Sequence, residues 1–412
     1  MRLSRINTLL TSTLLTAALY GCSAPVPKCD GGSCDVPPPA VTKVGFIYVG
    51  PVDRFGWTAS HEEGRLYLEQ YASDVTTVFR ESVSPADAPR VMDDFVDAGV
   101  SIVFATSFDF LDASLQAPAR HPGLATFNCS GFKTGPRAGN YQVRVEESEY
   151  LTGMVAGRMT RTNKIGVVGA LRIYEQVMHI NAFARGVRAV NPNAEINVRF
   201  VANWFNPPME LAAVRDLTAQ GNDIIKGLTD TTIPVEAVTD YTTDAGLPVY
   251  AIGHDNRNNC EAKPDTCLVS SFYNWGPLYK KLVEEQRAGA YPAGGRIDYL
   301  GQADIDIGGI SPFNAVVPQM VRDEVTLRQT AIRNRTFNIF AGPINKADGG
   351  VWLTAGQSFS DMDLICTRDF VEGVTVVDGP GCTTDPDCTN AFAAMTCVAG
   401  QCRSADLSGC TP

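Results

Sequence analysis

Two successive series of apolar runs, separated by helical patterns, constrain the fold of this chain more than any other feature. The first series is KVGFIYVG, VTTVFRES, SIVFATS and LATFNCS, with helical patterns near residues 57–72, 86–98 and 110–119. After a helix near 147–161 the series restarts with KIGVVGA, INVRFVANW, DIIKGLT and PVYAIGH, separated by helical patterns near 175–190, 208–219 and 233–243. Strands that alternate with helices indicate parallel sheets, and continuous apolar runs indicate sheets covered on both faces.

The repetition predicts an α/β protein with two similar lobes, the first at about 43–160 and the second at about 161–254. CLVSSFYNWG and the segments near 297–305 and 337–344 supply further strands, through which the chain returns to each lobe. A chain that crosses between two lobes several times forms a hinge. The alternative is a single large doubly wound domain.

The N-terminal segment predicts export and attachment to a membrane. Residues 1–21 carry two arginines before a short apolar run, as a secretory signal does. The run ends in LYGC, which resembles a lipobox, so we expect Cys22 to carry lipid; secretion without lipid is the alternative. Residues 22–42 are rich in Pro and Gly and are interpreted as a tether. The protein would then be anchored in the cell envelope, facing the periplasm or the exterior.

The charge of the chain excludes some partners. The formal net charge is −11, or −13 once the signal with Arg2 and Arg5 is removed, and no run of basic residues occurs. A nucleic-acid surface is therefore not expected. We expect a monomer.

The twelve cysteines fit an oxidising compartment. If Cys22 carries lipid, eleven remain and one is unpaired; Cys129, in the strand-like ATFNCSG, is the candidate for a free buried thiol. The disulfide candidates are Cys29, Cys34, Cys260, Cys267, Cys366, Cys382, Cys388, Cys397, Cys402 and Cys410. Residues 379–412 follow a two-lobed domain at 43–378 and are interpreted as a small disulfide-stapled tail, to which Cys366 could be bonded. A zinc site has less support, because the tail contains no His and no CxxC pair.

Rings and acids follow the ends of the predicted strands. Ligands of open α/β sheets bind beyond the carboxyl ends of the strands. The residues found there are Asp53, Arg54, Phe55, Trp57, Phe108, Asp109, Tyr174, Glu175, Trp204, Phe205, Asp230, His254, Asp255, Asn274 and Trp275. Rings from opposite lobes can sandwich a planar base, while carboxylates and amides accept or donate hydrogen bonds at its edge. Packing inside the lobes is the alternative role for each tryptophan taken singly.

Motifs for catalysis and cofactors are absent. No GxGxxG, GxxxxGK[ST] or GxSxG occurs, and the four histidines show no HExxH spacing. We therefore predict no catalytic residue, no metal and no cofactor. His61 is interpreted as a structural residue of the first helix, and His254 as a residue at the rim of the pocket.

Seven blocks of the chain are VGFIYVGPVDRFGWTASHEEGR, FATSFDFLD, TRTNKIGVVGA, INAFARGVRAVNPNAEINVRFVANWFNP, VYAIGHDN, NWGPLY and TFNIFAGPI. In sequence and order they resemble the BMP (basic membrane protein) family of ABC-transporter substrate-binding lipoproteins, which includes purine-nucleoside receptors. The resemblance runs from about Lys43 to Gly373. It implies a type I periplasmic-binding-protein fold whose two Rossmann-like lobes close over a purine base or nucleoside, adenine-like bases being the better expectation. It further implies delivery to an ABC permease; a sensor for a signalling partner and a nucleoside hydrolase are the alternatives.

The resemblance also implies roles for single residues. Trp57 would stack on the base and Asp255 would hold ribose hydroxyls. The other residues that match family motifs are Phe108, Glu175, Trp204, Asp230, Asn274 and Trp275. Arg54 stands where relatives usually have Asp. Either Asp53 substitutes for that acid or the pocket prefers a different, more acidic ligand, so the identity of the purine stays open. Asp53 and Phe55 complete the predicted ligand-binding set.

Overall fold

The computed structural model of the protein describes residues 41–243, 246–377, 395–398 and 401–404. The elements below belong to one unit that spans residues 41–412. The predicted signal, the lipidation of Cys22 and residues 22–40 of the predicted tether lie outside the described residues, as do Cys29, Cys34, Cys382, Cys388 and Cys410; Thr42, the last residue of the predicted tether, already belongs to the first strand, Thr42–Ile47. Within the described part of the chain, no helix combines the length and the apolar character needed to cross a membrane.

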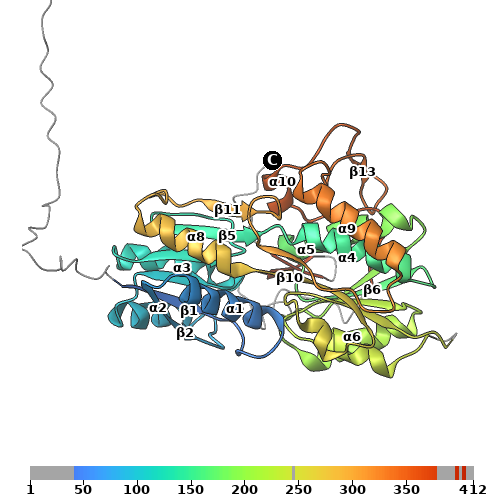
Figure 1. Cartoon of the computed structure of the whole chain (residues 1–412), viewed down its shortest axis with the longest axis horizontal. Coiled ribbons are helices and arrows are strands. Elements are labelled where there is room, and N and C mark those ends of the chain that lie inside the picture. The colour runs from blue at the N-terminus through green and yellow to red at the C-terminus, as the bar shows by residue number, and fades with distance from the viewer. Residues whose placement is uncertain (1–40, 244–245, 378–394, 399–400, 405–412) are drawn as a thin grey trace, which may run out of the picture. The chain divides into compact units, whose positions relative to one another are not determined.

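The first lobe is built on a six-stranded parallel sheet with the order β11-β5-β4-β3-β1-β2 (Figure 1). Its strands are β1 (Thr42–Ile47), β2 (Val75–Arg80), β3 (Ile102–Ala105), β4 (Ala125–Cys129), β5 (Ala138–Val143) and β11 (Ile297–Leu300). Its helices are α1 (Gly56–Tyr71), α2 (Ala88–Asp97), α3 (Leu111–Arg120) and α8 (Trp275–Arg287), with the 3-10 turn η1 (Phe108–Phe110).

The second lobe is built on a seven-stranded sheet with the order β12-β10-β9-β8-β6-β7-β15, in which only β12 runs antiparallel to its neighbour. Its strands are β6 (Lys164–Gly169), β7 (Glu195–Phe200), β8 (Ile224–Leu228), β9 (Tyr250–Gly253), β10 (Cys267–Tyr273), β12 (Gly308–Ile310) and β15 (Val374–Val376). Its helices are α4 (Glu146–Met159), α5 (Tyr174–Val190), α6 (Pro207–Ala219), α7 (Ile233–Glu236), α9 (Gln319–Arg333) and α10 (Asp361–Ile365), with the 3-10 turns η2 (Ala237–Asp240) and η3 (Asn259–Ala262). The hairpins β13–β14 (Ile344–Asn345, Val351–Leu353) and β16–β17 (Met395–Val398, Gln401–Ser404) complete the described elements.

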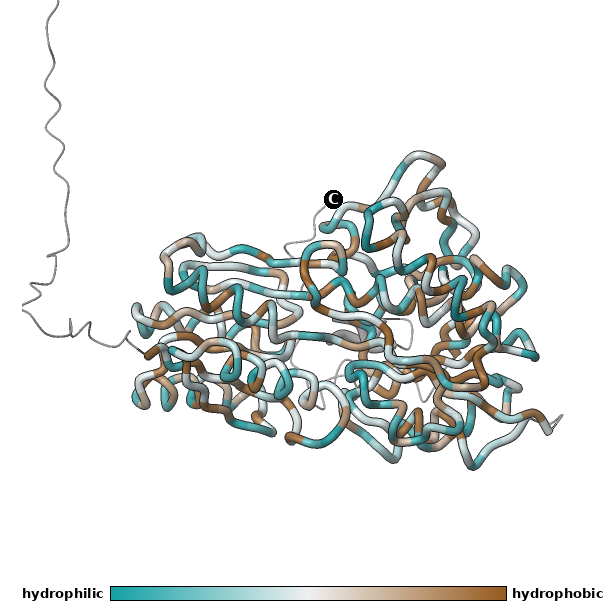
Figure 2. Tube along the Cα trace, viewed as in Figure 1, coloured by the Kyte–Doolittle hydropathy of each residue, from teal (hydrophilic) through white to brown (hydrophobic). Residues whose placement is uncertain are grey.

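Both faces of each sheet are buried, as the apolar runs predict. In β3, Phe104 packs in one apolar cluster of the first lobe and Val103 in another, because successive side chains of a strand point to opposite faces. In β8 of the second lobe, Ile224 and Ile225 likewise pack in two different apolar clusters, one on each face of the sheet. Figure 2 shows the apolar residues gathered along the strands of this lobe.

The chain crosses between the lobes three times: after β5, between β10 and α8, and between β11 and β12. We expected the first lobe to continue to about residue 160, but α4 packs against α5 in the core of the second lobe. The backbones of the two helices approach closely where a Cβ on Gly153 would lie 2.1 Å from the Phe183 carbonyl oxygen, and one on Gly186 would lie 1.9 Å from that of Tyr150. The first crossing therefore comes before α4.

Two segments differ from the expectation. A strand was expected near 337–344, but the structure has only β13 at its end, and Ile339 and Phe340 anchor an irregular segment in the core of the second lobe. Strand β5 was not expected, because Asn140 and Gln142 interrupt its apolar pattern, although both are buried.

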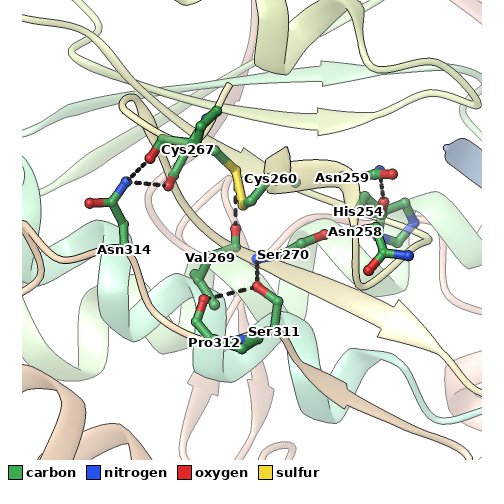
Figure 3. Close-up of a disulfide and its surroundings, with 12 residues drawn as sticks. His254, Asn258, Asn259, Cys260, Cys267, Val269, Ser270, Ser311, Pro312 and Asn314 are labelled. Carbon is green, nitrogen blue, oxygen red and sulfur yellow. Dashed lines mark hydrogen bonds between the residues drawn. A yellow bond between two sulfur atoms is a disulfide. The ribbon is translucent and has the colours of Figure 1, made fainter. Parts of the chain in front are cut away.

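The cysteines confirm three of the predictions. Cys129 is a free, buried thiol. Cys260 and Cys267 form a disulfide with an S–S distance of 2.03 Å (Figure 3). Cys366 is also disulfide-bonded. Its pairing with a tail cysteine stays a prediction.

Candidate ligand-binding site

A pocket lies between the two lobes, at the carboxyl ends of their strands. The first lobe contributes Val49, Trp57, Ser107, Phe108 and Ser130, and the second contributes Glu175, Gln176, His179, Trp204, Leu228, Asp230, His254, Asp255 and Tyr273. The pocket encloses about 390 Å³ when the part open to solvent is counted. A wider space of about 940 Å³ shares Val49, Trp204 and Asp230 with this pocket and forms its mouth.

The structure brings eight of the ten predicted ligand-binding residues to this site. Trp57, Phe108, Glu175, Trp204, Asp230 and Asp255 line the pocket, and Asp53 and Phe55 line the mouth. The side chain of Asn274 instead donates a hydrogen bond of 2.8 Å to the Asp306 carbonyl oxygen. Trp275 is only 1% exposed and stacks between His61 and Tyr273 in the core of the first lobe. These two residues miss the pocket because α8 begins at Trp275 and turns its ring back into the first lobe.

Several lining residues were not singled out from the sequence. His179 lies one helical turn after Glu175 on α5, so helical periodicity could have added it to the site. Tyr273 is the last residue of β10, directly before the predicted Asn274. Ser107, Ser130 and Gln176 carry no comparable signal, because single hydroxyl and amide residues occur throughout the chain.

Aromatic rings face the pocket from both lobes. The indole nitrogen of Trp57 donates to the Thr106 carbonyl oxygen at 2.7 Å, and its ring meets that of Tyr273 edge to face at 5.2 Å. Phe108, also from the first lobe, stacks on Phe132 at 6.1 Å. Trp204 lines the same pocket from the second lobe and lies where the pocket opens into its mouth.

Several buried polar atoms of the pocket have no hydrogen-bond partner among the described residues. They are Nε1 of Trp204, the hydroxyl of Tyr273 and both ring nitrogens of His179. Nearly all buried polar groups of native proteins are paired, so a cluster of unpaired ones needs an explanation. Recognition of a polar ligand provides it.

Buried carboxyl groups give the pocket its electrostatic character. Burial raises the pKa of Asp109 to about 7, that of Glu175 to about 7 and that of Asp255 to about 6. Burial, followed by repulsion from Asp255, also raises the pKa of Asp230. Ser130 Oγ donates a hydrogen bond of 2.8 Å to Glu175. Glu175, Asp230 and Asp255 line the pocket and would gain from a ligand that donates hydrogen bonds.

Burial lowers the pKa of His179 to about 3 and keeps this imidazole neutral. Its ring can therefore donate at one nitrogen and accept at the other.

A buried chain of charged groups holds Asp255 in place. Glu149 Oε2 lies 2.9 Å from Lys226 Nζ, and its Oε1 lies 2.7 Å from Nδ1 of His254. The other ring nitrogen of His254 lies 3.0 Å from Asp255 Oδ1. Burial opposes ionisation of Glu149, but Lys226 and His254 outweigh it and hold its pKa below the ordinary value. Asp255 itself has a φ of 68°, in the left-handed region that Asp enters more readily than most other non-glycine residues.

Direct contacts hold the lobes closed over the pocket. Arg54 pairs with Glu261 at 2.5 Å, the backbone N–H of Gly56 donates to Asn259 at 3.2 Å, and Asn256 donates to Glu63 at 3.0 Å. Figure 3 shows that Asn259 lies beside the Cys260–Cys267 disulfide, in the loop that reaches the first lobe.

Comparisons with known proteins agree with this arrangement. The profile of the Bmp family, described as PnrA-like ABC transporter substrate-binding proteins, matches residues 41–340. A purine-binding protein of Brucella abortus is 31% identical over 81% of this chain and 92% of its own length. A putative ABC transporter glucose-binding protein of Haloferax volcanii is 28% identical over 80% and 79%.

The fold recurs in a solved ABC transporter solute-binding protein from Conexibacter woesei. The two structures superimpose with a TM-score of 0.58 at 21% identity, over 72% of this chain and 98% of the other. The expected periplasmic-binding-protein fold is thereby confirmed. From the profile match and the Brucella relative it follows that the chain belongs to the Bmp family of PnrA-like ABC transporter substrate-binding proteins.

Proposed function

We propose that this protein binds a purine base or nucleoside between its lobes and delivers it to a membrane permease. The observation that carries the proposal is a pocket that Trp57 and Phe108 of one lobe and Trp204 of the other line together. Flat rings on opposite walls suit a planar heterocycle, and stacking on one ring contributes about 1–3 kcal/mol. Closure of the lobes would bring both walls against the ligand.

The polar groups of the pocket complement a purine. The indole N–H of Trp204 and the hydroxyl of Tyr273 can donate to ring nitrogens, while Glu175 and Asp255 can accept from an exocyclic amine or from ribose hydroxyls. No Lys or Arg lines the pocket among the described residues, so a phosphate group would meet several carboxyls there and no lysine or arginine. The proposed ligand is therefore unphosphorylated.

Transport follows from binding and closure without covalent chemistry. A ligand that contacts both lobes stabilises the closed form, and a permease would recognise that form. Lipid on Cys22 would keep the protein beside its permease. The Brucella relative supports a purine, whereas the name of the Haloferax relative points to a sugar.

The test is to identify the ligand directly. Small molecules released on denaturation of the purified protein would be identified by mass spectrometry, and adenine, adenosine, guanosine and glucose would be titrated by calorimetry. We expect at least one purine to bind at a single site and glucose to show no binding. Binding of glucose in preference to every purine would replace the proposal by a sugar receptor.

A further inference from the structure

A second cavity lies at the hinge and shares no lining residue with the ligand pocket. It is a groove of about 1220 Å³, counted with the part open to solvent. One wall comes from Arg144 in the first crossing, from Glu146 and Glu147 at the start of α4, and from Tyr299 near the end of β11. The opposite wall comes from the second lobe and includes Phe337 and Phe359. We call it the hinge groove.

The arginines of the hinge groove are already paired with carboxylates. Arg144 bonds to Asp361 of α10, and Arg335 bonds to Asp304 of the third crossing. An anionic ligand would have to displace one of these partners. The cationic side chains therefore do not define a site for an anion.

Two neighbouring carboxyl groups of the hinge groove have acceptor oxygens to spare, although Arg144 pairs with one of them at 3.6 Å. Glu147 accepts a hydrogen bond of 2.8 Å from the backbone N–H of Gln302. Glu146 is 1% exposed; its Oε1 accepts from the Tyr299 hydroxyl at 2.5 Å and lies 3.6 Å from Arg144 Nη1. Its Oε2 has no hydrogen-bond partner among the described residues. Burial raises the pKa of Glu146 to about 8, so this carboxyl gains if a positive charge arrives.

Rings in the hinge groove already pack against cations. The guanidinium of Arg144 lies 4.0 Å from the centre of the Tyr299 ring, and that of Arg328 lies 3.8 Å from the centre of the Phe337 ring. Phe337 and Phe359 are only half-buried, so they offer apolar surface next to the carboxyls. Ring faces attract cations and cover apolar bodies.

We propose that the hinge groove is a second binding site, for a primary amine carried on a small apolar body. The ammonium group lies against Glu146 and Glu147, and the apolar body lies against Phe337 and Phe359. This site does not depend on the identity of the ligand in the pocket between the lobes.

Two short connections link the hinge groove to that pocket. Glu146 lies one turn before Glu149 on α4, and Glu149 belongs to the charged chain that holds Asp255. The Tyr299 hydroxyl lies 3.0 Å from the sulfur of Met178, which precedes the lining residue His179 on α5. The ammonium group would bind Glu146, which contacts Arg144 of the first crossing and Tyr299 of β11, and it thus biases the equilibrium between open and closed lobes.

The experiment is a calorimetric titration of the full mature chain with 2-phenylethylamine, and with 2-phenylethanol as its uncharged counterpart. The same titrations are run on Glu146→Gln, Glu147→Gln and Glu284→Gln. The last variant removes an exposed carboxylate on α8 that pairs with Lys280, so it controls for net charge. Gln at 146 can still accept from Tyr299, and thermal unfolding confirms that each variant is folded.

We expect one amine per chain in the unmodified protein and no binding of the alcohol. Loss of a charge-assisted hydrogen bond should weaken amine binding about tenfold or more in the first two variants and leave Glu284→Gln unchanged. Absence of saturable amine binding, equal affinity in all variants, or equally tight binding of the alcohol would each overturn the proposal.

Discussion

Trp57 and Trp204 face the same pocket, but the protein holds them in different ways. Trp57 is 9% exposed, donates its N–H to Thr106 and packs edge to face against His61 and Tyr273. Trp204 is more exposed, and its N–H has no partner among the described residues. Truncating Trp57 would therefore damage the core of the first lobe together with the pocket. Truncating Trp204 would affect mainly the ligand.

We expect Trp204→Ala to weaken purine binding by about 1–3 kcal/mol, the contribution of one stacked ring. Calorimetry with adenine measures the effect. The matched control is Trp352→Ala, because Trp352 packs against Phe359 in the second lobe and lines neither the pocket nor its mouth. Equal loss of affinity in both variants, or none in either, would reject the stacking role of Trp204.

The raised pKa of Glu175 predicts how the free energy of unfolding changes with pH. Its pKa is about 7 in the folded protein and near 4.5 in the unfolded chain, so the folded state binds the proton more tightly. The destabilisation from Glu175 is absent below pH 4.5, grows as the pH rises and is complete above pH 7. Gln cannot ionise and keeps an acceptor for Ser130.

Glu175→Gln should therefore unfold like the unmodified protein at pH 4, and be more stable than it at pH 8 by up to about 3 kcal/mol. Urea unfolding of both proteins at several pH values without ligand measures the difference. A difference that does not change between pH 4 and pH 8 would show that Glu175 ionises normally.

At the scale of elements, the start of α1 is the point where the first lobe meets the loop after β8. Gly56 has a φ of 83°, and a Cβ there would lie 2.2 Å from the carbonyl oxygen of Asp230. Since these residues belong to different lobes, a side chain at position 56 obstructs closure rather than folding. Gly99 is the matched control position, because its φ of 84° is almost equal to that of Gly56 and nothing lies within 4 Å of the position that a Cβ would take.

We expect Gly56→Ala to weaken purine binding about tenfold or more, because the closed form can no longer make this contact. Gly99→Ala should leave affinity unchanged. Both variants should lose about 1 kcal/mol of stability from the left-handed conformation. Affinity comes from calorimetry and stability from urea unfolding. Unchanged affinity in Gly56→Ala would mean that the ligand does not require this closed form.

The elements also show which strands and site residues can be predicted from sequence patterns. Continuous apolar runs such as SIVFATS predict a strand, because the side chains on both faces are buried. The same rule overlooks β5, whose Asn140 and Gln142 are buried among polar partners, and it predicts a strand near 337–344, where apolar residues serve as anchors of a loop. Trp275 shows the equivalent limit for the site: its position after a strand is visible in the sequence, but the direction in which α8 turns it is not.

At the scale of the whole molecule, the closed form depends on contacts between groups that are far apart in the chain. Arg54 and Glu261 form the outermost of these, with side chains 69% and 54% exposed. The sequence shows that Arg54 departs from the family pattern but not that its partner lies across the cleft. Patterns predicted two lobes and a chain that returns to each, because strands and helices follow from local periodicity, but they placed the first crossing after α4 and not before it. The contacts that form on closure depend on the relative position of the lobes. Local sequence patterns contain no information about that position.

An exposed ion pair contributes at most about 1 kcal/mol, so Arg54→Ala should weaken purine binding by less than about fivefold. The effect should shrink as salt is raised from 0.05 M to 0.5 M, because exposed charges are screened. Glu261→Ala should behave in the same way. Calorimetry at both salt concentrations measures it. A larger loss that salt does not change would give Arg54 a direct part in the ligand site.

The Cys260–Cys267 disulfide fixes the stretch of backbone that carries Asn259 and Glu261 to the first lobe. The cross-link restrains this stretch before the ligand binds, so the stretch loses little conformational entropy when the lobes close. A reductant that opens the cross-link should make the bound molecule escape faster while leaving its rate of capture nearly unchanged. Stopped-flow measurement of ligand dissociation, with and without prior reduction, would show whether the redox state of this disulfide sets the lifetime of the complex.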